Sequence, residues 1–445
     1  MKRHVVALLA ALLALALRAP GVAAEPARAA SAPQAPPLRE LAGPTLPRSA
    51  LLQSLLSQAP SLARARALEQ AAGAQGDALR AGSQEFTAQA QWQQRRIDQA
   101  PDAGDYSEWQ LLLSRPLRLP AQARADSALA GALEQSSRSA LASARSELLA
   151  ELLRDWLAAQ LGRADAQLAA AESQALDRET ASVIRRERLG DASRLELEQL
   201  RAEQARAAAA LLLARGRADS QRAALLARWP VLAADPDLRG QHGSGHLLRL
   251  PALDPAGLRR QVLRNSRRLA QARSDLLEAQ ARAAQAQAAR TPQPSVGAYL
   301  GSDRGGRERI VGLQLQLPFA GPARRAHEQA ALAELQAAQW RLDDLRSQVL
   351  QQADGLYLQA RAEGDAARAL GQAALRQRQA QARMLRAWQL GEVGVAQWLL
   401  ARRNAVEVER QALQARFDAA RSAALLRLQA GLLDIPGAGV SAPAR

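Results

Sequence analysis

The stretch Val311-Gly312-Leu313-Gln314-Leu315-Gln316-Leu317-Pro318-Phe319 alternates large apolar residues with glycine and glutamine. This alternation predicts a β-strand with two different faces, because successive side chains of a strand point to opposite sides. Val311, Leu313, Leu315 and Leu317 share the apolar face, and the glutamines share the other. Pro318 ends the pattern, and a long run rich in Ala, Arg, Gln, Glu and Leu follows.

The end of this strand has an earlier counterpart. Leu315-Gln316-Leu317-Pro318 matches Leu117-Arg118-Leu119-Pro120, 198 residues before it. Leu189-Gly190-Asp191 similarly matches Leu390-Gly391-Glu392, 201 residues after it. Two pairs of landmarks in the same order and at nearly the same offset indicate an internal duplication.

Each half has the same order of segments: a helix, two strands joined by a turn, a long helical run, a Leu-Gly turn and another helix. The first helices are expected at 51–81 and 257–290, and the strands at 86–93, 106–119, 295–300 and 310–317. In the second of these strands, Arg115 falls on the apolar side. The adjacent Pro116 marks either a bulge or the rim of the sheet.

The long runs are the strongest signal. Ala121 to Arg188 and Ala323 to Leu390 each hold 68 residues without proline. At 1.5 Å per residue each continuous helix would be about 100 Å long. Such helices need coiled-coil packing, and abundant alanine lets them approach closely. The fold class is therefore mainly α, a duplicated coiled-coil structure with a small β part.

The N-terminus has the three parts of a secretory signal peptide. Lys2 and Arg3 precede the apolar run Val5 to Leu17, and Val22-Ala23-Ala24 supplies small residues for cleavage. The run has 13 residues, whereas a membrane-spanning helix needs about 20. The expected organisation is a signal peptide at 1–24, repeats at 25–228 and 257–432, a non-helical equatorial connection at 229–256, and a C-terminal tail at 433–445.

Composition argues against several functions. The 445 residues include no cysteine, and 59 basic against 43 acidic residues give a net charge of +16. The arginines are interleaved with acids and glutamines, so we expect solvated helix faces rather than a nucleic-acid interface. His242 and His246 lie in a Gly-rich stretch without a nearby carboxylate, which disfavours a metal site. We find no catalytic constellation and no phosphate-binding loop, and we expect neither enzymatic activity nor a cofactor.

The strand count bears on assembly. One chain offers four strands, whereas bacterial membrane barrels have at least about eight. An open sheet in lipid would leave backbone groups without hydrogen bonds at both edges. Three chains would close a barrel of twelve strands, with the apolar faces toward lipid and the glutamines toward the lumen.

With this order of segments, the chain resembles the TolC-like outer-membrane factor family over nearly all of the expected mature sequence. The resemblance rests on residues 311–319 leading into 326–357 and on the paired Leu-Gly motifs at 189–190 and 390–391. It implies a homotrimer whose barrel lies in the outer membrane of a Gram-negative bacterium. A helical tunnel would cross the periplasm and meet an inner-membrane pump through a periplasmic adaptor.

The resemblance also implies roles for the two turns. In that family the Leu-Gly end meets the adaptor, which here corresponds to Arg186, Leu189, Gly190, Asp191, Ser193, Trp388, Leu390, Gly391 and Glu392. Family members often carry a ring of acids beyond the second Leu-Gly, but Gln397 and Leu400 stand there in this chain. Acids at the tunnel mouth would come from Glu196 and Glu198 in the first repeat.

The leading function is therefore a passive efflux duct. By family analogy, the modest length and the lack of an acylated cysteine favour pumps of the proton-driven heavy-metal branch. A periplasmic coiled-coil adaptor or scaffold without a pore is the alternative, and an enzyme on a helical frame is a more distant one. The transported substrate, the identity of the pump, the gate residues and the way the tip opens do not follow from the residues.

Overall fold

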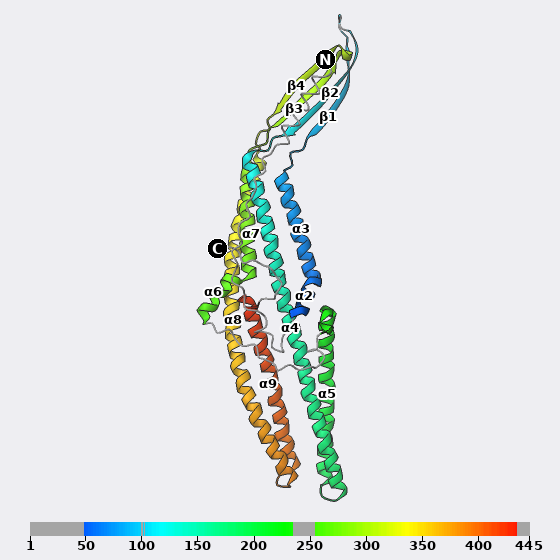
Figure 1. Cartoon of the computed structure of the whole chain (residues 1–445), viewed down its shortest axis with the longest axis vertical. Helices are drawn as coiled ribbons and strands as arrows, with labels where there is room; N and C mark the ends of the chain where they lie inside the picture. The colour runs from blue at the N-terminus through cyan, green and yellow to red at the C-terminus, as the bar shows by residue number, and fades with distance from the viewer. Residues whose placement is uncertain (1–48, 99–100, 102, 235–253, 434–445) are drawn as a thin grey trace. The chain divides into compact units, whose positions relative to one another are not determined.

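The computed structural model describes residues 49–98, 101, 103–234 and 254–433, which all belong to one compact unit (Figure 1). The expected signal peptide, the pair His242 and His246, and the tail beyond Leu433 lie outside the described residues.

Two repeats of helices and strands make up the described chain. The first repeat contains α2 (Ser49–Gln58), α3 (Pro60–Ala81), β1 (Thr87–Ile97), β2 (Gly104–Pro116), α4 (Pro120–Arg188) and α5 (Arg194–Arg228). The second contains α6 (Pro255–Asn265), α7 (Arg267–Ala288), β3 (Ser295–Asp303), β4 (Glu308–Gln316), α8 (Pro322–Gln389) and α9 (Val395–Gln429). Equivalent helices have nearly equal lengths: 22 and 22 residues for α3 and α7, 69 and 68 for α4 and α8, and 35 and 35 for α5 and α9. The expected duplication is confirmed.

The two long helices start differently. α4 begins at Pro120 itself, whereas α8 begins at Pro322, four residues after Pro318. Proline fits the first turn of a helix because the amide that it lacks would have no partner there. The start of α8 is four residues later than Pro318, and α8 is one residue shorter than α4, which together give the difference between the offsets of 198 and 201.

Each expected first helix is in fact two helices. Pro60 begins α3 directly after α2, and Ser266 separates α6 from α7 with an extended backbone (φ −60°, ψ 115°). The Ser266 hydroxyl accepts a hydrogen bond from the Leu269 amide at 3.3 Å, which caps α7. Each repeat therefore contains one helix break that the helix-favouring composition did not reveal.

The expected connection at 229–256 is not wholly irregular. Pro230–Ala234 forms a short 3-10 helix, η2, and α6 begins at Pro255, inside the expected connection. The Asp254 carboxylate accepts a hydrogen bond from the Gly257 amide at 2.9 Å and caps α6. Asp followed by proline is a strong start signal for a helix. The helix therefore begins at Pro255, two residues earlier than expected.

The strands form one antiparallel sheet in the order β1-β2-β3-β4. β1 runs to Ile97, further than the sequence pattern, and β2 ends at Pro116, before the expected Leu119. A short 3-10 turn, η4 (Arg304–Gly306), joins β3 to β4. β1 and β4 are the edge strands, so one edge of each lacks a partner strand among the residues that the structure describes.

The helices pack pairwise, with α4 against α5 and α8 against α9, while α3 and α7 lie along α4 (Figure 1). Trp156, Leu152 and Leu232 are fully buried where α4, α5, α9 and η2 meet. Ala353, Ala360 and Ala424 are also at most 1% exposed. Alanine at these contacts allows the close helix approach expected from composition.

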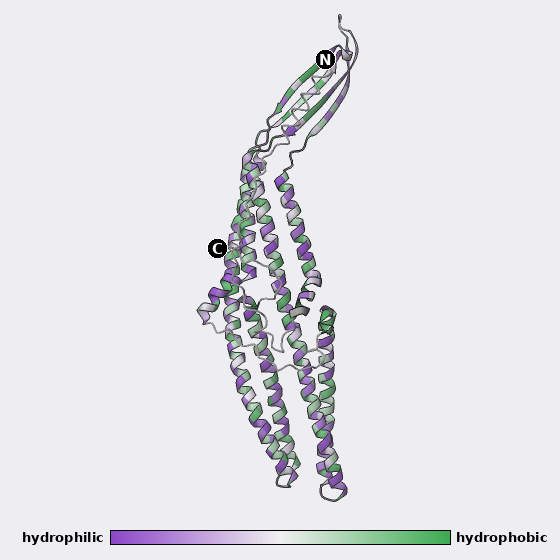
Figure 2. Ribbon diagram, in the orientation of Figure 1, coloured by the Kyte–Doolittle hydropathy of each residue, from purple (hydrophilic) through white to green (hydrophobic). Residues whose placement is uncertain are grey.

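Hydrophobic and hydrophilic residues are interleaved along the helices (Figure 2). Among the described helices, none contains a stretch long and apolar enough to cross a membrane.

Candidate functional site: the exposed sheet and the helical turns

One face of the sheet is apolar and exposed. Residues paired across an antiparallel ladder lie on the same face, so each row can be followed through the four strands. The rows of this face are Ala90-Leu111-Leu300-Val311 and Ala88-Leu113-Ala298-Leu313. Leu315 pairs with Val296 in the next row, and Leu317 follows the end of β4. Val311, Leu313, Leu315 and Leu317 are 84, 88, 63 and 58% exposed, respectively.

The opposite face is polar and rich in glycine and glutamine. Gln91, Gln110 and Gly301 form one row, and Ser114, Gly297 and Gln314 another. Tyr299 pairs with Gly312, and its ring lies across the glycine. A Cβ at Gly312 would come within 2.4 Å of the Tyr299 Cζ atom. Only glycine leaves room for the ring there.

Arg115 marks the end of the apolar face. The ladder runs through Arg115 without a bulge, so the rim interpretation of Pro116 is the one that fits. The guanidinium lies 4.8 Å above the Phe86 ring, and its Nε donates to the Gln84 carbonyl at 2.9 Å. The charge is therefore partnered at the point where the sheet meets the helices.

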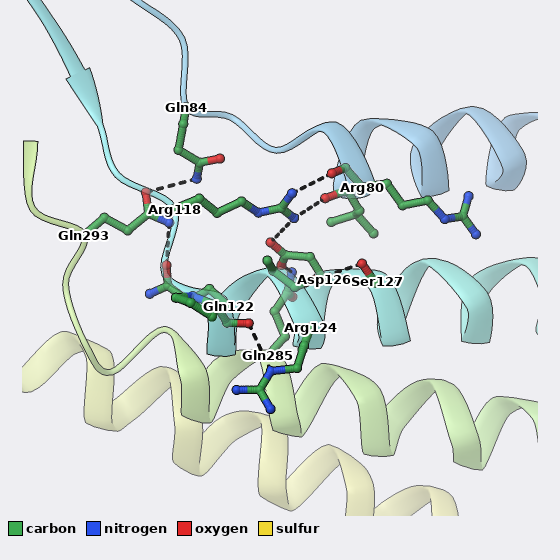
Figure 3. Close-up of polar contacts among 12 residues, drawn as sticks. Arg80, Gln84, Arg118, Gln122, Arg124, Asp126, Ser127, Gln285 and Gln293 are labelled. Atoms are coloured by element: carbon green, nitrogen blue, oxygen red, sulfur yellow. Dashed lines mark hydrogen bonds and ion pairs between the residues drawn. The ribbon is translucent and has the colours of Figure 1, made fainter. Parts of the chain in front are cut away.

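Arg118 ties this end of the sheet to the helices (Figure 3). Its Nη1 and Nη2 donate to the carbonyls of Arg80 and Leu79 at 2.5 and 2.6 Å, which caps the C-terminus of α3. Nη2 also donates to the Asp126 carboxylate of α4 at 2.8 Å. In the second repeat Arg324 of α8 donates to the Ala289 carbonyl after α7. A cation at a helix C-terminus satisfies carbonyls that have no partner within the helix.

A chain of glutamines runs beside Arg118 (Figure 3). The Gln84 amide donates to Gln293 at 3.0 Å, Gln293 donates to Gln122 at 2.5 Å, and Gln122 donates to the Thr291 carbonyl at 2.7 Å. These bonds join the segments before β1 and before β3 to the first turn of α4. The strands of the two repeats are thus held together at their helical end.

The two Leu-Gly motifs form the same turn. After α4, the amides of Gly190 and Asp191 donate to the carbonyls of Glu187 and Arg186 at 3.0 and 2.8 Å. After α8, the amides of Gly391 and Glu392 donate to Trp388 and Ala387 at 3.0 and 2.8 Å. These are Schellman motifs, which require a left-handed residue. Gly190 and Gly391 adopt φ of +83° and +78°.

Most of the predicted tip residues are at the surface. Leu189 and Leu390 are 76 and 75% exposed, and Asp191, Ser193 and Glu392 are also exposed. The Ser193 hydroxyl accepts a hydrogen bond from the Glu196 amide at 3.1 Å, so it also caps α5. Both leucines lie beside the left-handed glycines, in two separate turns that each present one apolar side chain.

Trp388 differs from the exposed residues of the turns, because it is only 3% exposed. Its ring stacks on Trp398 with centroids 4.5 Å apart and planes 7° apart. Its Nε1 donates to Glu196 at 2.8 Å. Trp388 is the second-last residue of α8, and its ring packs between the two helical hairpins.

The acids expected at a tunnel mouth have different surroundings. The Glu196 side chain is 16% exposed and lies 3.9 Å from the Arg186 guanidinium, besides accepting from Trp388. Glu198 is 56% exposed and pairs with Arg201 of its own helix at 3.1 Å. Glu198 is thus open to solvent, whereas Glu196 is engaged between α4, α5 and α8.

Sequence reasoning missed the ion pairs that link the hairpins. Arg402 of α9 is 5% exposed, and its Nε donates to the Glu172 carboxylate of α4 at 2.7 Å. The adjacent Arg403 pairs with Glu203 of α5 at 3.0 Å. Hydrogen bonding to Glu203 raises the pKa of Arg403 further above its usual range. Arg and Glu are too common in these helices for spacing to identify such pairs.

No protein-family model and no curated protein matches the sequence. Solved structures do match. The outer-membrane channel OprN is 19% identical, with 87% of this chain and 90% of that chain covered and a TM-score of 0.72. The outer membrane protein VceC from Vibrio cholerae is 19% identical, with 86% and 95% covered and a TM-score of 0.67.

A third match is the open state of the MtrE outer membrane channel of Neisseria gonorrhoeae. It is 18% identical, with 86% of this chain and 88% of that chain covered and a TM-score of 0.64. The protein therefore has the fold of outer-membrane channels, in which long helices are combined with a small β part. At this level of identity the likeness defines the fold.

Proposed function

We propose that the protein is the outer-membrane exit duct of a tripartite efflux system in a Gram-negative bacterium, conducting substrates passively to the outside. The observation that carries this proposal is the exposed apolar face of a four-stranded sheet in a chain with a channel fold. Soluble proteins rarely expose large continuous apolar surface without a partner. Lipid is the partner that fits a face of alternating leucines, and the polar face then lines a lumen.

The dimensions of the apolar face support a place in the membrane. Aromatic residues lie near both of its ends, with Phe86 and Phe319 at the helical end and Trp92 and Trp109 toward the turns. Phe86 and Trp92 are six residues apart, which is about 20 Å along a strand. Outer-membrane barrels have an apolar band about 25 Å tall between girdles of aromatic residues.

The sheet edges support a homotrimer. β1 and β4 each have one edge without a partner strand in the described chain. Backbone groups at an open edge in lipid would cost several kcal/mol each, so the edges need partners. Pairing β1 of one copy with β4 of the next would give a closed barrel of twelve strands from three chains.

The turns at Leu189-Gly190 and Leu390-Gly391 would dock a periplasmic adaptor that connects the duct to an inner-membrane pump. An exposed leucine at each turn supplies apolar contact area, and three copies present six similar turns. Arg186, Asp191, Ser193 and Glu392 would supply the polar rim, with Glu198 at the tunnel mouth. The heavy-metal branch of pumps is the preferred partner class by family analogy.

Two measurements test the duct. Mass determination in detergent is expected to give three copies, and a monodisperse monomer in plain buffer would overturn the proposal. Single cysteines at 313, 314, 315 and 316 in whole cells are expected to alternate in their reaction with a membrane-impermeant thiol reagent. Gln314→Cys and Gln316→Cys should react through the lumen, whereas Leu313→Cys and Leu315→Cys should be shielded by lipid. Equal reactivity at all four positions would contradict the assignment of faces.

A further inference from the structure

Arginines on the apolar face of the sheet differ in their surroundings. Arg96 and Arg115 share this face by the register of the ladder, and both have partners. The Arg96 Nε lies 3.5 Å from Asp98 and 3.6 Å from Asp105. Arg115 bonds to the Gln84 carbonyl and stacks on Phe86. Arg309 is also on this face, is exposed, and has no hydrogen bond or ion pair with the part of the chain that the structure describes.

Arg309 lies in a ladder row with residues that are typical of the membrane–water interface. The ladder pairs Trp92 with Trp109, Trp109 with Ser302, and Ser302 with Arg309. The two indoles are 66 and 42% exposed, and the Trp92 Nε1 donates to the Ser107 hydroxyl at 2.8 Å, on the turn side of this row. Tryptophan with an apolar ring and a satisfied N–H is typical of the boundary between lipid tails and headgroups. If the apolar face lies in a membrane, the row that contains Arg309 is at headgroup depth.

A second unpaired cation lies next to Arg309. Arg307 precedes β4 by one residue, is exposed, and its guanidinium has no partner among the described residues. Arg307 has helical backbone angles (φ −71°, ψ −26°) and is two residues from Arg309, at most about 7 Å along the chain. Two extended arginine side chains at this separation can reach one phosphate group. The Ser302 hydroxyl opposite Arg309 can add a hydrogen bond to the same group.

Acidic residues near this site belong to the other face. Glu308 alternates with Arg309 along β4 and pairs with Asp303 across the ladder, so both carboxylates are on the polar side. Glu308 lies 3.4 Å from the Arg304 guanidinium, which partners its charge. These two carboxylates therefore do not neutralise Arg309 on the apolar face. The acids described beside Arg96 on that face, Asp98 and Asp105, already lie against the Arg96 guanidinium.

We propose that Arg307, Ser302 and Arg309 form a binding site for a phosphate group of a glycolipid in the outer leaflet. The inference rests on the proposed function, because it needs the apolar face to lie in the outer membrane. In that placement the helices extend into the periplasm, so the turns at the other end of the strands reach the outer leaflet.

The chemistry favours phosphate over other headgroup atoms. Guanidinium presents a planar fork of donors that matches phosphate oxygens two at a time. A charged arginine at the edge of a lipid-facing surface extends toward the headgroups, where a counter-charge stabilises it. Each cation near an anionic lipid surface contributes enough to change binding about fivefold.

The test uses the full-length trimer in detergent and native mass spectrometry of bound lipid. The probes are lipid A with both phosphates, lipid A after complete removal of phosphate, and phosphatidylglycerol. The wild-type trimer is expected to retain phosphorylated lipid A over both other lipids. Arg309→Gln should weaken this retention about fivefold, and Arg307→Gln with Arg309→Gln should weaken it further. Arg96→Gln is the matched control, because Arg96 is an exposed arginine of the same face that already has acidic partners.

Each outcome has a defined meaning. Equal retention of phosphorylated and dephosphorylated lipid A by the wild type would overturn the site. An equal loss in Arg96→Gln and Arg309→Gln would also overturn it, because only the net charge would then matter. Preference for phosphatidylglycerol would exclude the glycolipid as the occupant. These results need an intact trimer in detergent, so a chain that forms no trimer refutes the proposed function instead, and the two failures are distinguishable.

Discussion

The indole Nε1 of Trp388 donates a hydrogen bond to the Glu196 carboxylate at 2.8 Å, joining the end of α8 to the first turn of α5. The two residues belong to different repeats and to different helical hairpins. The same indole stacks on Trp398, and Val183, Leu197 and Leu200 pack in the same buried cluster. The ends of the hairpins are thus held together by one polar bond and an apolar layer just inside the exposed turns.

Removing the acceptor should loosen this end of the hairpins. Glu196→Ala leaves the Trp388 N–H without its partner in a largely buried position, and hydrogen bonds to charged groups contribute about 1.5–3 kcal/mol. We expect a lower unfolding midpoint and faster hydrogen exchange at residues 384–400. Glu196→Gln keeps an acceptor oxygen and should lie between the wild type and Glu196→Ala.

Glu198→Ala is the control for this effect. Glu198 is exposed and pairs only with Arg201 in its own helix among the described contacts, so its loss should change stability by less than about 0.5 kcal/mol. An equal effect of Glu196→Ala and Glu198→Ala would show that the bond to Trp388 contributes nothing.

The glycines of the turns can be separated into a backbone role and a docking role. No atom lies within 4 Å of a Cβ built at Gly391, so Gly391→Ala meets no clash. Its φ of +78° should still cost Ala about 1–2 kcal/mol. Gly391→Asn should cost less, because asparagine tolerates the left-handed region better. The measurements are the unfolding midpoint and capture of the adaptor by the purified trimer.

The asparagine variant separates the two roles. If Gly391→Asn folds normally and still captures the adaptor, the glycine serves the turn conformation. If it folds normally but loses capture, the bare backbone of the turn is part of the docking surface. The same pair of substitutions at Gly190, with φ of +83°, provides an independent repetition.

The sequence predicted those parts of the fold that depend on local patterns. The period-two alternation at 311–317 and the paired Leu-Gly motifs depend only on neighbouring residues, and they located β4 and both turns. The breaks at Pro60 and Ser266 were missed, since alanine-rich helical composition continues on both sides of them. A single proline or capping serine changes the backbone without changing the periodicity around it.

The contacts between the repeats could not be predicted in this way. Arg402 and Glu172 are 230 residues apart, and nothing in the spacing of either residue marks the other. The resemblance places Trp388 at the tip, two residues before Leu390, and the structure adds that its ring is buried against Trp398. Moving one residue along a helix changes the face on which a side chain lies, from the surface to the core. Apolar residues are spread around these helices, so the sequence does not show which face is buried.

The close contact between Tyr299 and Gly312 gives a test of the sheet. Gly312→Ala would place a Cβ about where the Tyr299 ring lies, because the distance to Cζ would be 2.4 Å. We expect a loss of about 1–3 kcal/mol in trimer stability, as is usual for overpacking. Adding Tyr299→Ala should recover part of that loss, so the two effects should be non-additive.

Gly321→Ala is the matched control for this pair. A Cβ at Gly321 would meet no atom within 4 Å, and the backbone there has a φ of −92° that any residue adopts. An equal loss in Gly312→Ala and Gly321→Ala would indicate that the effect comes from glycine itself rather than from the tyrosine ring.

Arg118 provides a prediction for the junction between sheet and helices. Arg118→Gln removes the donors to the carbonyls of Leu79 and Arg80 and the ion pair with Asp126. The Arg118 side chain is 19% exposed, and we expect a loss of about 2 kcal/mol. Hydrogen exchange should increase at the last turn of α3. In contrast, Arg124→Gln removes a bond at 3.3 Å to Pro120 in its own helix and should leave α3 protected.

The attachment of α6 to α8 should depend on pH. Arg259 donates to both Asp354 carboxylate oxygens at 2.8 and 2.7 Å, and this hydrogen bonding lowers the pKa of Asp354 below its ordinary value of 3.8. An acid with a lowered pKa in the folded state stabilises that state above its unfolded pKa. The contribution is lost as the pH falls from about 4 through the folded pKa. Hydrogen exchange of residues 255–265, corrected for the intrinsic rate, should therefore rise at pH 3 relative to pH 6.

Substitution identifies the carboxylate responsible for this pH dependence. Asp354→Asn removes the charge, so α6 should exchange faster at pH 6 and should change little further at pH 3. Asp343→Asn on the same helix is the control, because Asp343 is exposed and its carboxylate has no partner among the described residues. It should leave the exchange of α6 and its pH dependence unchanged. If Asp354→Asn behaves like the wild type at both pH values, the pair with Arg259 does not hold α6 in place.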